Sequence, residues 1–324
     1  MSKYVIVVES GADVTPELRE RYGIVSVPMH VTMGDETVDD GSIDPLEIYS
    51  RCNEMGQMPK TSGCSPADFN EVYDRIHAEQ PEATILHLAY SEVTTCSHQS
   101  SKIAAEGRDY VYSMDTRFVS VGQSLIAVEA AKYIEANPDA TVEEIFSFVE
   151  SVMDRVLLGF VPTDLAFLKV GGRLSNVAFL GAHLLKIKPC IEVTGGKFVA
   201  TKKFRGSMLK CARAFLDHMV EKGDIDFSHI GLAYSVGLSE ELRGDMEVYA
   251  RELGFEDITW TQVGGVISSH CGPTAFGAVL LQSNHVLLRA QAPQRPPAQR
   301  ARSVFSKLSG RCGSIFAHTA HVFA

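Results

Sequence analysis

The sequence predicts an α/β protein with two α/β domains. The N-terminal domain is expected to have a mainly parallel sheet flanked by helices, and the C-terminal domain a mixed sheet that contains a hairpin. Runs of β-branched residues alternate with helical patterns along the chain, which is typical of parallel sheets. The chain has 324 residues, 45% of them hydrophobic, and this length favours two packed domains over one. We expect a ligand cleft between the domains.

Helix starts can be placed in the N-terminal domain from a shared pattern. A side chain that can accept a hydrogen bond is followed by proline at the first helical position, as in Thr15-Pro16, Asp44-Pro45 and Ser65-Pro66. Thr141 and Glu144 have the spacing of a capping box, which predicts another helix start. The expected strands of this domain are residues 4–8, 24–33, 84–89 and 110–113.

The second domain is expected to begin after two long helices at residues 121–135 and 142–156. Further along, Gly195-Gly196 separates two strand-like runs, and paired glycines favour the primed turn of a β-hairpin. We therefore predict an N-terminal domain at residues 1–156 and a C-terminal domain at residues 157–281. The expected strands of the second domain are residues 157–161, 190–193, 197–202, 230–234 and 258–263.

The remaining segment, residues 282–324, has a different composition. It contains basic residues and no acidic ones, although the whole chain has a formal charge of -10. Its stretch rich in proline, glutamine and arginine, residues 292–302, cannot build a packed core. We expect a basic, poorly ordered tail that is either an interaction segment or an appended or out-of-frame extension.

Composition excludes several kinds of protein. Nucleic-acid binding needs clustered lysine and arginine, which the acidic body lacks, so no nucleic-acid partner is expected. The seven cysteines occur singly, without a CxxC pair or the Cys/His spacing of a zinc site. The first residues contain no charged leader and no long apolar run. We therefore expect a cytoplasmic protein with at most transient membrane-surface contact.

Common nucleotide and metal motifs are also missing from the sequence. Walker A, GxGxxG after a strand, HExxH, GxSxG and EF-hand spacings do not occur, so the sequence predicts no metal, no cofactor and no catalytic residue. In open α/β sheets, ligands bind to the loops at the carboxyl ends of the strands. The candidate site is therefore sought in these loops.

Two hydroxyl-rich loops precede expected helices. Residues 60–66 place Thr61 and Ser62 just before a helix N-terminus, where unpaired N–H groups attract anions such as carboxylates. Residues 90–100, which include Ser91, supply further donors after an expected strand. The alternative reading is that both segments are polar loops whose hydroxyls only cap helices.

Two glycine-containing segments supply a cation and an imidazole. Gly171-Gly172 lets the backbone approach closely, and Arg173 after it offers a planar group suited to carboxylate or phosphate. His270 stands in a glycine-bounded loop, residues 264–273, and could donate to an acid group. The alternatives are a helix C-cap followed by a surface arginine, and a structural histidine.

Taken in order, these segments resemble the DegV family, whose members bind fatty acids, and in particular the fatty-acid-binding component of bacterial fatty acid kinase. The resemblance runs from Val5 to about Leu281. The motifs that carry it are Ser10-Gly11-Ala12-Asp13, Val27-Pro28, Asp40-Gly41, Lys60-Thr61-Ser62, Ser65-Pro66, Gln99-Ser100, Asp115-Thr116-Arg117, Gly122-Gln123, Gly171-Gly172-Arg173-Leu174-Ser175, Ile187-Lys188-Pro189, Arg205-Gly206 and His270-Cys271-Gly272-Pro273.

The resemblance implies a long-chain fatty acid whose tail lies in an apolar tunnel between the domains. It also implies a non-catalytic subunit that presents the carboxylate to a separate ATP-dependent kinase subunit, which forms the acyl phosphate. By the same resemblance, the carboxylate contacts are Thr61, Ser62, Ser91 and His270, with Arg173 and Arg205 as nearby cations or partner contacts.

Three positions depart from the family pattern. Glu9 stands where aspartate is usual, Glu92 where a second serine is common, and Gly63-Cys64 where Gln-Pro is frequent. Glu92 matters most, because a carboxylate beside the fatty-acid head group would repel it unless Glu92 turns outward or is protonated.

Two other functions fit parts of the same sequence. One is an enzyme of the dihydroxyacetone-kinase type, in which His270 would engage a small carbonyl substrate. The other is a lipid carrier without a kinase partner. An apolar tunnel would argue against the first, and ATP-dependent formation of acyl phosphate with a partner would argue against the second.

Overall fold

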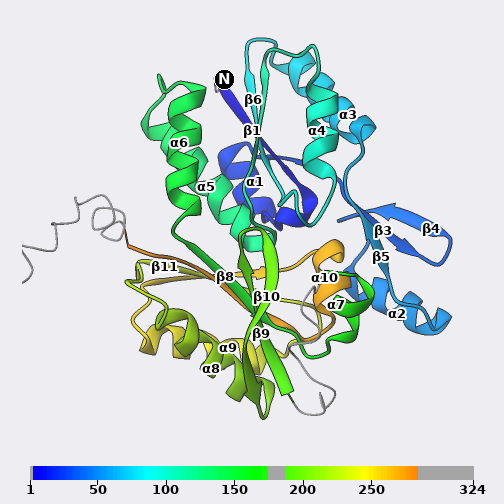
Figure 1. Cartoon of the computed structure of the whole chain (residues 1–324), viewed down its shortest axis with the longest axis vertical. Helices are drawn as coiled ribbons and strands as arrows, with labels where there is room; N and C mark the ends of the chain where they lie inside the picture. Colours follow the sequence, from blue (N-terminus) through cyan, green and yellow to red (C-terminus); the bar gives the residue numbers. More distant parts are fainter. Residues whose placement is uncertain (1–2, 174–186, 284–324) are drawn as a thin grey trace, which may run out of the picture. The chain divides into compact units, whose positions relative to one another are not determined.

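A computed structural model describes residues 3–173 and 187–283 of the chain (Figure 1). Its N-terminal part contains a four-stranded sheet in the order β2-β1-β6-β7, in which every pair of neighbours is parallel. This confirms the predicted parallel sheet. The strands are β1 (Tyr4–Glu9), β2 (Val25–Val27), β6 (Thr84–Ala89) and β7 (Val111–Asp115).

Helices lie on both faces of this sheet, with α3 and α4 on one side and α5 and α6 on the other (Figure 1). The predicted caps are confirmed, since Thr15, Asp44, Ser65 and Thr141 each accept a hydrogen bond from the first helical turn that follows. The short helix η1 (Ser10–Ala12) directly follows β1. The α-helices are α1 (Pro16–Tyr22), α2 (Pro45–Met55), α3 (Pro66–Glu79), α4 (Ser97–Ala105), α5 (Ser120–Ala136) and α6 (Val142–Met153).

A small antiparallel sheet in the order β4-β3-β5 extends from the N-terminal part. Its strands are β3 (His30–Met33), β4 (Glu36–Asp39) and β5 (Lys60–Ser62). The prediction of one strand at residues 24–33 is wrong, because β2 and β3 belong to different sheets and Pro28 lies between them. Proline has no N–H to give to a sheet, so the chain can turn from one sheet to the other here.

The C-terminal part is built on a six-stranded mixed sheet in the order β10-β9-β8-β13-β11-β12. Only β11 and β12 run parallel; the other neighbours are antiparallel, as predicted for a mixed sheet. The predicted hairpin joins β9 to β10, and Gly195 and Gly196 both have positive φ, as a primed turn requires. The strands are β8 (Val156–Val161), β9 (Ile187–Thr194), β10 (Lys197–Arg205), β11 (His229–Tyr234), β12 (Asp257–Gln262) and β13 (Phe276–Leu281).

Four described helices belong to the C-terminal part: α7 (Ala166–Val170), α8 (Met208–Val220), α9 (Glu240–Glu252) and α10 (Gly265–Cys271). The expectation of a loop at residues 264–273 is wrong, because α10 occupies most of this segment. The N–H groups at the start of this helix donate hydrogen bonds to Asp13 and Asp40, which are far away in the sequence, and local patterns do not reveal these contacts.

Helix α5 connects the two main sheets. It contacts β1 and β6 of the parallel sheet and also β8 and β13 of the mixed sheet. Its residues are buried on nearly all sides over its first three turns, which explains its continuously apolar sequence. One buried cluster therefore extends from the parallel sheet to the near face of the mixed sheet, and a second lies between the mixed sheet and helices α8 and α9.

Contacts join residues up to Ser283 into one compact unit, and the domain limits at 156/157 and 281/282 stay predictions. The predicted tail begins inside this unit, since the Gln282 N–H donates to the Arg155 carbonyl at 2.9 Å and the Ser283 N–H to the Asp224 carbonyl at 2.8 Å. The rest of the tail, residues 284–324, lies outside the described residues, as does the Leu174-Ser175 part of the glycine-arginine motif.

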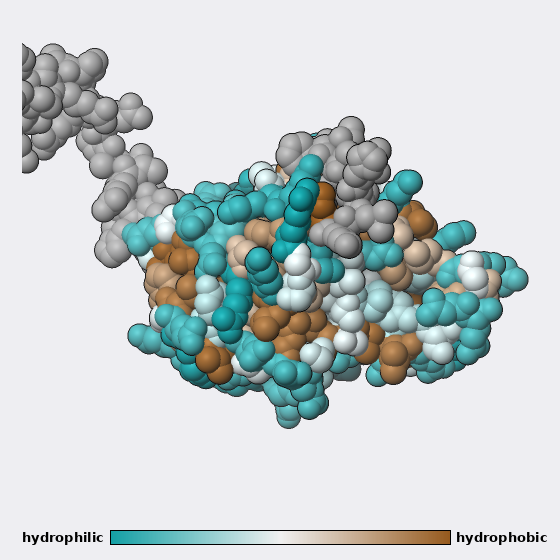
Figure 2. Space-filling model, turned by 90° about the horizontal axis from the view of Figure 1, so that it is seen from below, coloured by the Kyte–Doolittle hydropathy of each residue, from teal (hydrophilic) through white to brown (hydrophobic). Residues whose placement is uncertain are grey.

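No helix among the described residues is long and apolar enough to cross a bilayer. On the face shown in Figure 2, hydrophobic residues reach the surface in separate groups between hydrophilic ones. Scattered exposed apolar residues of this kind are normal for a folded protein. The apolar surface that matters for a ligand lies inside the molecule.

Candidate functional site

A pocket lies between the parallel sheet and the mixed sheet. The space between its wall atoms is about 840 Å³ when the open mouth is included. Most of its wall is apolar, and both parts of the chain contribute. The apolar wall includes Met29, Val119, Val121, Leu158, Phe160, Leu168, Val193, Phe198, Val263, Val266, Ile267, Ala275 and Phe276.

Strand β8 shows how the sequence produces this wall. Leu158 and Phe160 line the pocket, whereas Leu157 and Val161 pack in the cluster on the other side of the sheet. Successive side chains of a strand point to opposite faces, so a strand apolar at every position can supply a core on one face and a ligand wall on the other. The continuous apolar run at residues 156–161 is therefore the local signal for the pocket wall.

One end of the pocket is polar. Thr61 from β5, Arg173 after α7 and His270 from α10 all line it. The Thr61 Oγ1 and His270 Nε2 atoms lie 2.8 Å apart. Three residues that the sequence nominated separately are thus brought to one pocket from distant segments.

His270 is partly buried. Burial, together with the positive charge of Arg173, lowers the pKa of His270 to about 4, so the imidazole is neutral near pH 7. Its Nδ1 atom is buried and has no hydrogen-bond partner among the described residues. A neutral imidazole carries one N–H donor and no charge.

Gly171 allows His270 to occupy this position. A Cβ atom at residue 171 would lie 2.3 Å from His270 Nδ1, far inside contact distance. Arg173 is held close by, since its Nη1 donates to the Gly171 carbonyl at 2.6 Å. Gly171 was predicted to permit close approach, and it permits the close approach of the His270 side chain. Arg173, two positions later, is the cation of the polar end.

The other three nominated residues do not line the pocket. Ser62 is exposed, because it follows Thr61 in β5 and adjacent strand residues point to opposite faces. Ser91 is fully buried and donates to the Gly196 carbonyl at 2.9 Å, which ties the β6–α4 loop to the β9–β10 turn. Arg205 is exposed at the end of β10.

The pocket is also lined by polar residues that sequence reasoning did not single out. Thr94 donates to the Ser91 carbonyl at 2.8 Å, and Ser235 donates to the Gly272 carbonyl at 2.7 Å. The Ser120 hydroxyl donates to Asp13. Their hydrogens are used within the protein, so these hydroxyls face a ligand chiefly as acceptors. Among the sequence signals, only the hydroxyl-rich loop at residues 90–100 pointed to any of them.

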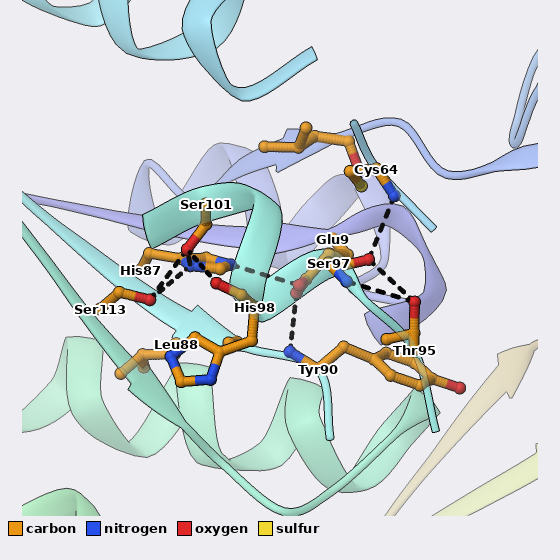
Figure 3. Close-up of polar contacts among 12 residues, drawn as sticks. Glu9, Cys64, His87, Leu88, Tyr90, Thr95, Ser97, His98, Ser101 and Ser113 are labelled. Carbon is orange, nitrogen blue, oxygen red and sulfur yellow. Dashed lines mark hydrogen bonds and ion pairs between the residues drawn. The ribbon is translucent and has the colours of Figure 1, made fainter. Parts of the chain in front are cut away.

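A buried polar cluster supports the loop that carries Tyr90 into the pocket wall (Figure 3). Glu9 is fully buried and accepts hydrogen bonds from the Tyr90 N–H and from Gln123 Nε2, each at 2.8 Å. Its second oxygen lies 3.3 Å from His87 Nε2. Burial would raise the pKa of Glu9, but His87 and these hydrogen bonds outweigh burial and lower it. Glu9 thus fixes the start of the β6–α4 loop as a carboxylate.

Glu92 turns away from the pocket. Its carboxylate lies 2.9 Å from His98 Nδ1 and 4.0 Å from Lys102 Nζ, and half of the side chain is exposed. Glu92 therefore adds no negative charge to the pocket wall.

Gly63 is the second departure from the family pattern that the structure explains. A Cβ atom there would lie 2.3 Å from Thr95 Oγ1 and 2.5 Å from Ser97 Oγ. The missing side chain lets the segment after β5 approach the start of α4, where the Cys64 N–H donates to Ser97 Oγ at 3.1 Å. Gly63 thereby becomes part of the pocket wall.

The helix that carries His270 is held by two acidic side chains, Asp13, which is buried, and Asp40, which is partly buried. Asp13 accepts a hydrogen bond from the Gly264 N–H at 2.7 Å, and Asp40 accepts one from the Val266 N–H at 3.1 Å. Burial raises the pKa of Asp13 to about 8, and burial also raises that of Asp40. The position of α10, and hence of His270, is set by residues of the N-terminal part.

Comparisons with known proteins agree with this architecture. Residues 3–283 match the profile of a family described as "Uncharacterised protein, DegV family". A "Fatty acid-binding protein" of Thermotoga maritima is 30% identical over 289 residues, covering 85% of this chain and 96% of that protein.

Two solved structures have the same fold. One is described as fatty acid binding of a DegV family protein from Thermus thermophilus, with a TM-score of 0.76, 26% identity and coverage of 86% of this chain and 100% of that one. The other is the Streptococcus pneumoniae Fatty Acid Kinase (Fak) B3 protein loaded with linoleic acid, with a TM-score of 0.73, 19% identity and coverage of 87% and 100%.

Proposed function

The chain belongs to the DegV family, and from this premise we propose that it binds a long-chain fatty acid in the pocket between its two sheets. The observation that carries the proposal is an apolar pocket with its cation, imidazole and hydroxyl at one end. A fatty acid has the same division between an apolar tail and one charged group. The relative from Thermotoga maritima and the structure from Thermus thermophilus are both described by fatty-acid binding.

The affinity would come chiefly from the acyl chain. Burial of a methylene group contributes about 0.8 kcal/mol, so a long tail supplies most of the binding free energy. The polar end then determines the direction in which the molecule lies. Arg173 would provide the charge that complements the carboxylate, while Thr61 and neutral His270 would provide hydrogen bonds.

The roles of Ser62, Ser91 and Arg205 differ from those of the pocket residues in this proposal. Ser91 would have to give up its hydrogen bond to Gly196 to contact a head group directly. Ser62 and Arg205 are exposed, so we assign them to the surface that a partner protein would contact.

The finer proposal is that the bound carboxylate is presented to a separate ATP-dependent kinase subunit, which forms the acyl phosphate. Phosphoryl transfer depends mainly on positioning and on stabilisation of charge, so a subunit that only holds the acceptor oxygen can be essential. A protein of the same fold that bears the name Fatty Acid Kinase (Fak) B3 is described as loaded with linoleic acid.

Two experiments test these statements separately. Native mass spectrometry of the purified full chain should show an added mass, and the extracted molecule should be a fatty acid. The protein mixed with fatty acid and ATP should form no acyl phosphate until a fatty acid kinase subunit is added. Formation of acyl phosphate by the chain alone would favour the enzyme of the dihydroxyacetone-kinase type. Binding without product in the presence of the kinase would favour a lipid carrier.

A further inference from the structure

Three side chains that are common zinc ligands converge on the outer side of strand β9, away from the pocket. They are Cys190 and Glu192 of β9 and His218 of α8, and their potential ligand atoms all lie within 4.8 Å of one another. Cys190 Sγ is 3.7 Å from Glu192 Oε1, and His218 Nε2 is 2.9 Å from the same oxygen. We propose that Cys190, Glu192 and His218 form a binding site for a zinc-like divalent cation.

The chemistry of the three groups favours such a cation. Zinc binds thiolate, imidazole and carboxylate together, with bonds of about 2.3 Å to sulfur and 2.0–2.2 Å to nitrogen and oxygen. Around a tetrahedral ion these bonds separate sulfur from oxygen by roughly 3.6 Å and nitrogen from oxygen by roughly 3.3 Å. The two separations that involve Glu192 Oε1, 3.7 Å to sulfur and 2.9 Å to nitrogen, lie within about 0.4 Å of these values.

The backbone explains why these side chains meet. Cys190 and Glu192 are two positions apart in a strand and therefore point to the same face, where α8 packs against the sheet. The pairing of β9 with β10 shifts between Ala200 and Lys202, which leaves Thr201 as the extra residue of a β-bulge. The bulge turns the Thr201 hydroxyl onto Glu192 Oε1, at 2.5 Å. The oxygen atom of Glu192 that faces Cys190 and His218 thus has a third polar neighbour.

The second oxygen of Glu192 is used differently. Lys222 Nζ lies 2.5 Å from Glu192 Oε2 and would remain as a partner of the oxygen that does not bind the metal. A cavity beside the cluster is lined by Glu192, Lys222 and Arg117.

Binding would rearrange protons in a defined way. The Cys190 thiol would release its proton to water as the Sγ–metal bond forms. His218 would bind through Nε2 and carry its proton on Nδ1, which would displace Lys202, whose Nζ lies 3.5 Å from that atom. Lys202 is exposed, so it can turn into solvent.

Cobalt binding to the full, reduced chain tests the proposal, because cobalt bound to a thiolate absorbs strongly in the near ultraviolet. We expect one Co²⁺ per chain with this absorption, and the absorption should be lost in Cys190→Ser. Cys211→Ser is the matched control, since Cys211 is also a buried free cysteine and should leave the absorption unchanged. Absence of the band in the wild-type protein, or its persistence in Cys190→Ser, would overturn the proposal.

Two further variants keep the test valid if Cys190→Ser fails to fold. The side chain of His218 is 18% exposed, so His218→Ala should fold, and Zn²⁺ should raise the melting temperature of the wild-type protein but not of this variant. Lys222→Met removes a positive charge beside the site and should tighten cobalt binding by roughly tenfold or more. A similar rise in melting temperature with Zn²⁺ in His218→Ala would place the cation elsewhere and refute the assignment.

Discussion

Thr61 and His270 are separated by 209 positions in the sequence, yet Thr61 Oγ1 and His270 Nε2 are 2.8 Å apart. One comes from the small antiparallel sheet of the N-terminal part and the other from a short helix of the C-terminal part. Their contact closes the polar end of the pocket across the two halves. The pocket therefore depends on the way in which α10 is held against β3 and β5.

Thr61→Val should weaken fatty-acid binding by roughly tenfold, because a hydrogen bond of about 1–2 kcal/mol is lost while the shape of the side chain is kept. Titration with a fluorescent fatty acid measures the change. Ser62→Ala is the matched control, since the exposed Ser62 side chain points to the opposite face of the same strand. Equal losses in both variants would contradict the assignment of Thr61 to the head group.

Gly171→Ala should displace His270 and lower fatty-acid affinity without preventing folding. The added methyl group would lie 2.3 Å from His270 Nδ1, so the imidazole must move away from the pocket end. Gly244→Ala is the control, because a Cβ there meets no atom within 4 Å. That substitution should leave binding unchanged and stabilise α9 by about 0.5–1 kcal/mol. Unaltered binding by Gly171→Ala would show that His270 does not contact the ligand.

His270 should make the free protein less stable as the pH falls. Burial and Arg173 lower its pKa from 6.5 to about 4 in the folded state, so between these values the unfolded chain binds more protons. Its contribution to stability is therefore complete above pH 6.5 and is lost as the pH falls toward 4. Denaturant titrations at several pH values should show a shallower decline for His270→Gln than for the wild-type protein. An equal decline in stability for the two proteins as the pH falls would be inconsistent with a buried neutral imidazole.

Asp13 should have the opposite effect on stability. Burial raises its pKa from 3.8 to about 8 in the folded state, so here the folded chain holds the proton to higher pH. Stability should consequently decrease as the pH rises from 4 to 8. Asp13→Asn keeps an acceptor for the Gly264 N–H and should flatten this decrease, as measured by melting temperatures across the window. A decrease of unchanged steepness in the variant would mean that another group causes it.

Local chemistry in the sequence was sufficient for many elements. The caps at Thr15, Ser65 and Thr141 act over three residues, and the glycine pair at 195–196 acts within one turn. These features depend on neighbours in the chain, so they could be predicted. Thr61, Arg173 and His270 were nominated from their own segments of the sequence, and all three line the pocket. The resemblance to the DegV family added the expectation of an apolar pocket between the domains.

Other features follow from contacts that no local pattern encodes. The segments around Thr61 and His270 were expected to be loops, but strand pairing with β3 and hydrogen bonds to Asp13 and Asp40 make them a strand and a helix. The sequence alone determined which residue types were present and which caps, turns and apolar strands they would form. Only the tertiary structure decided that Thr61 faces the pocket while Ser62 faces outward, and that Cys190 and Glu192 meet His218. The physical reason is that strand register and helix packing set the direction of a side chain, and both are fixed by residues distant in the chain.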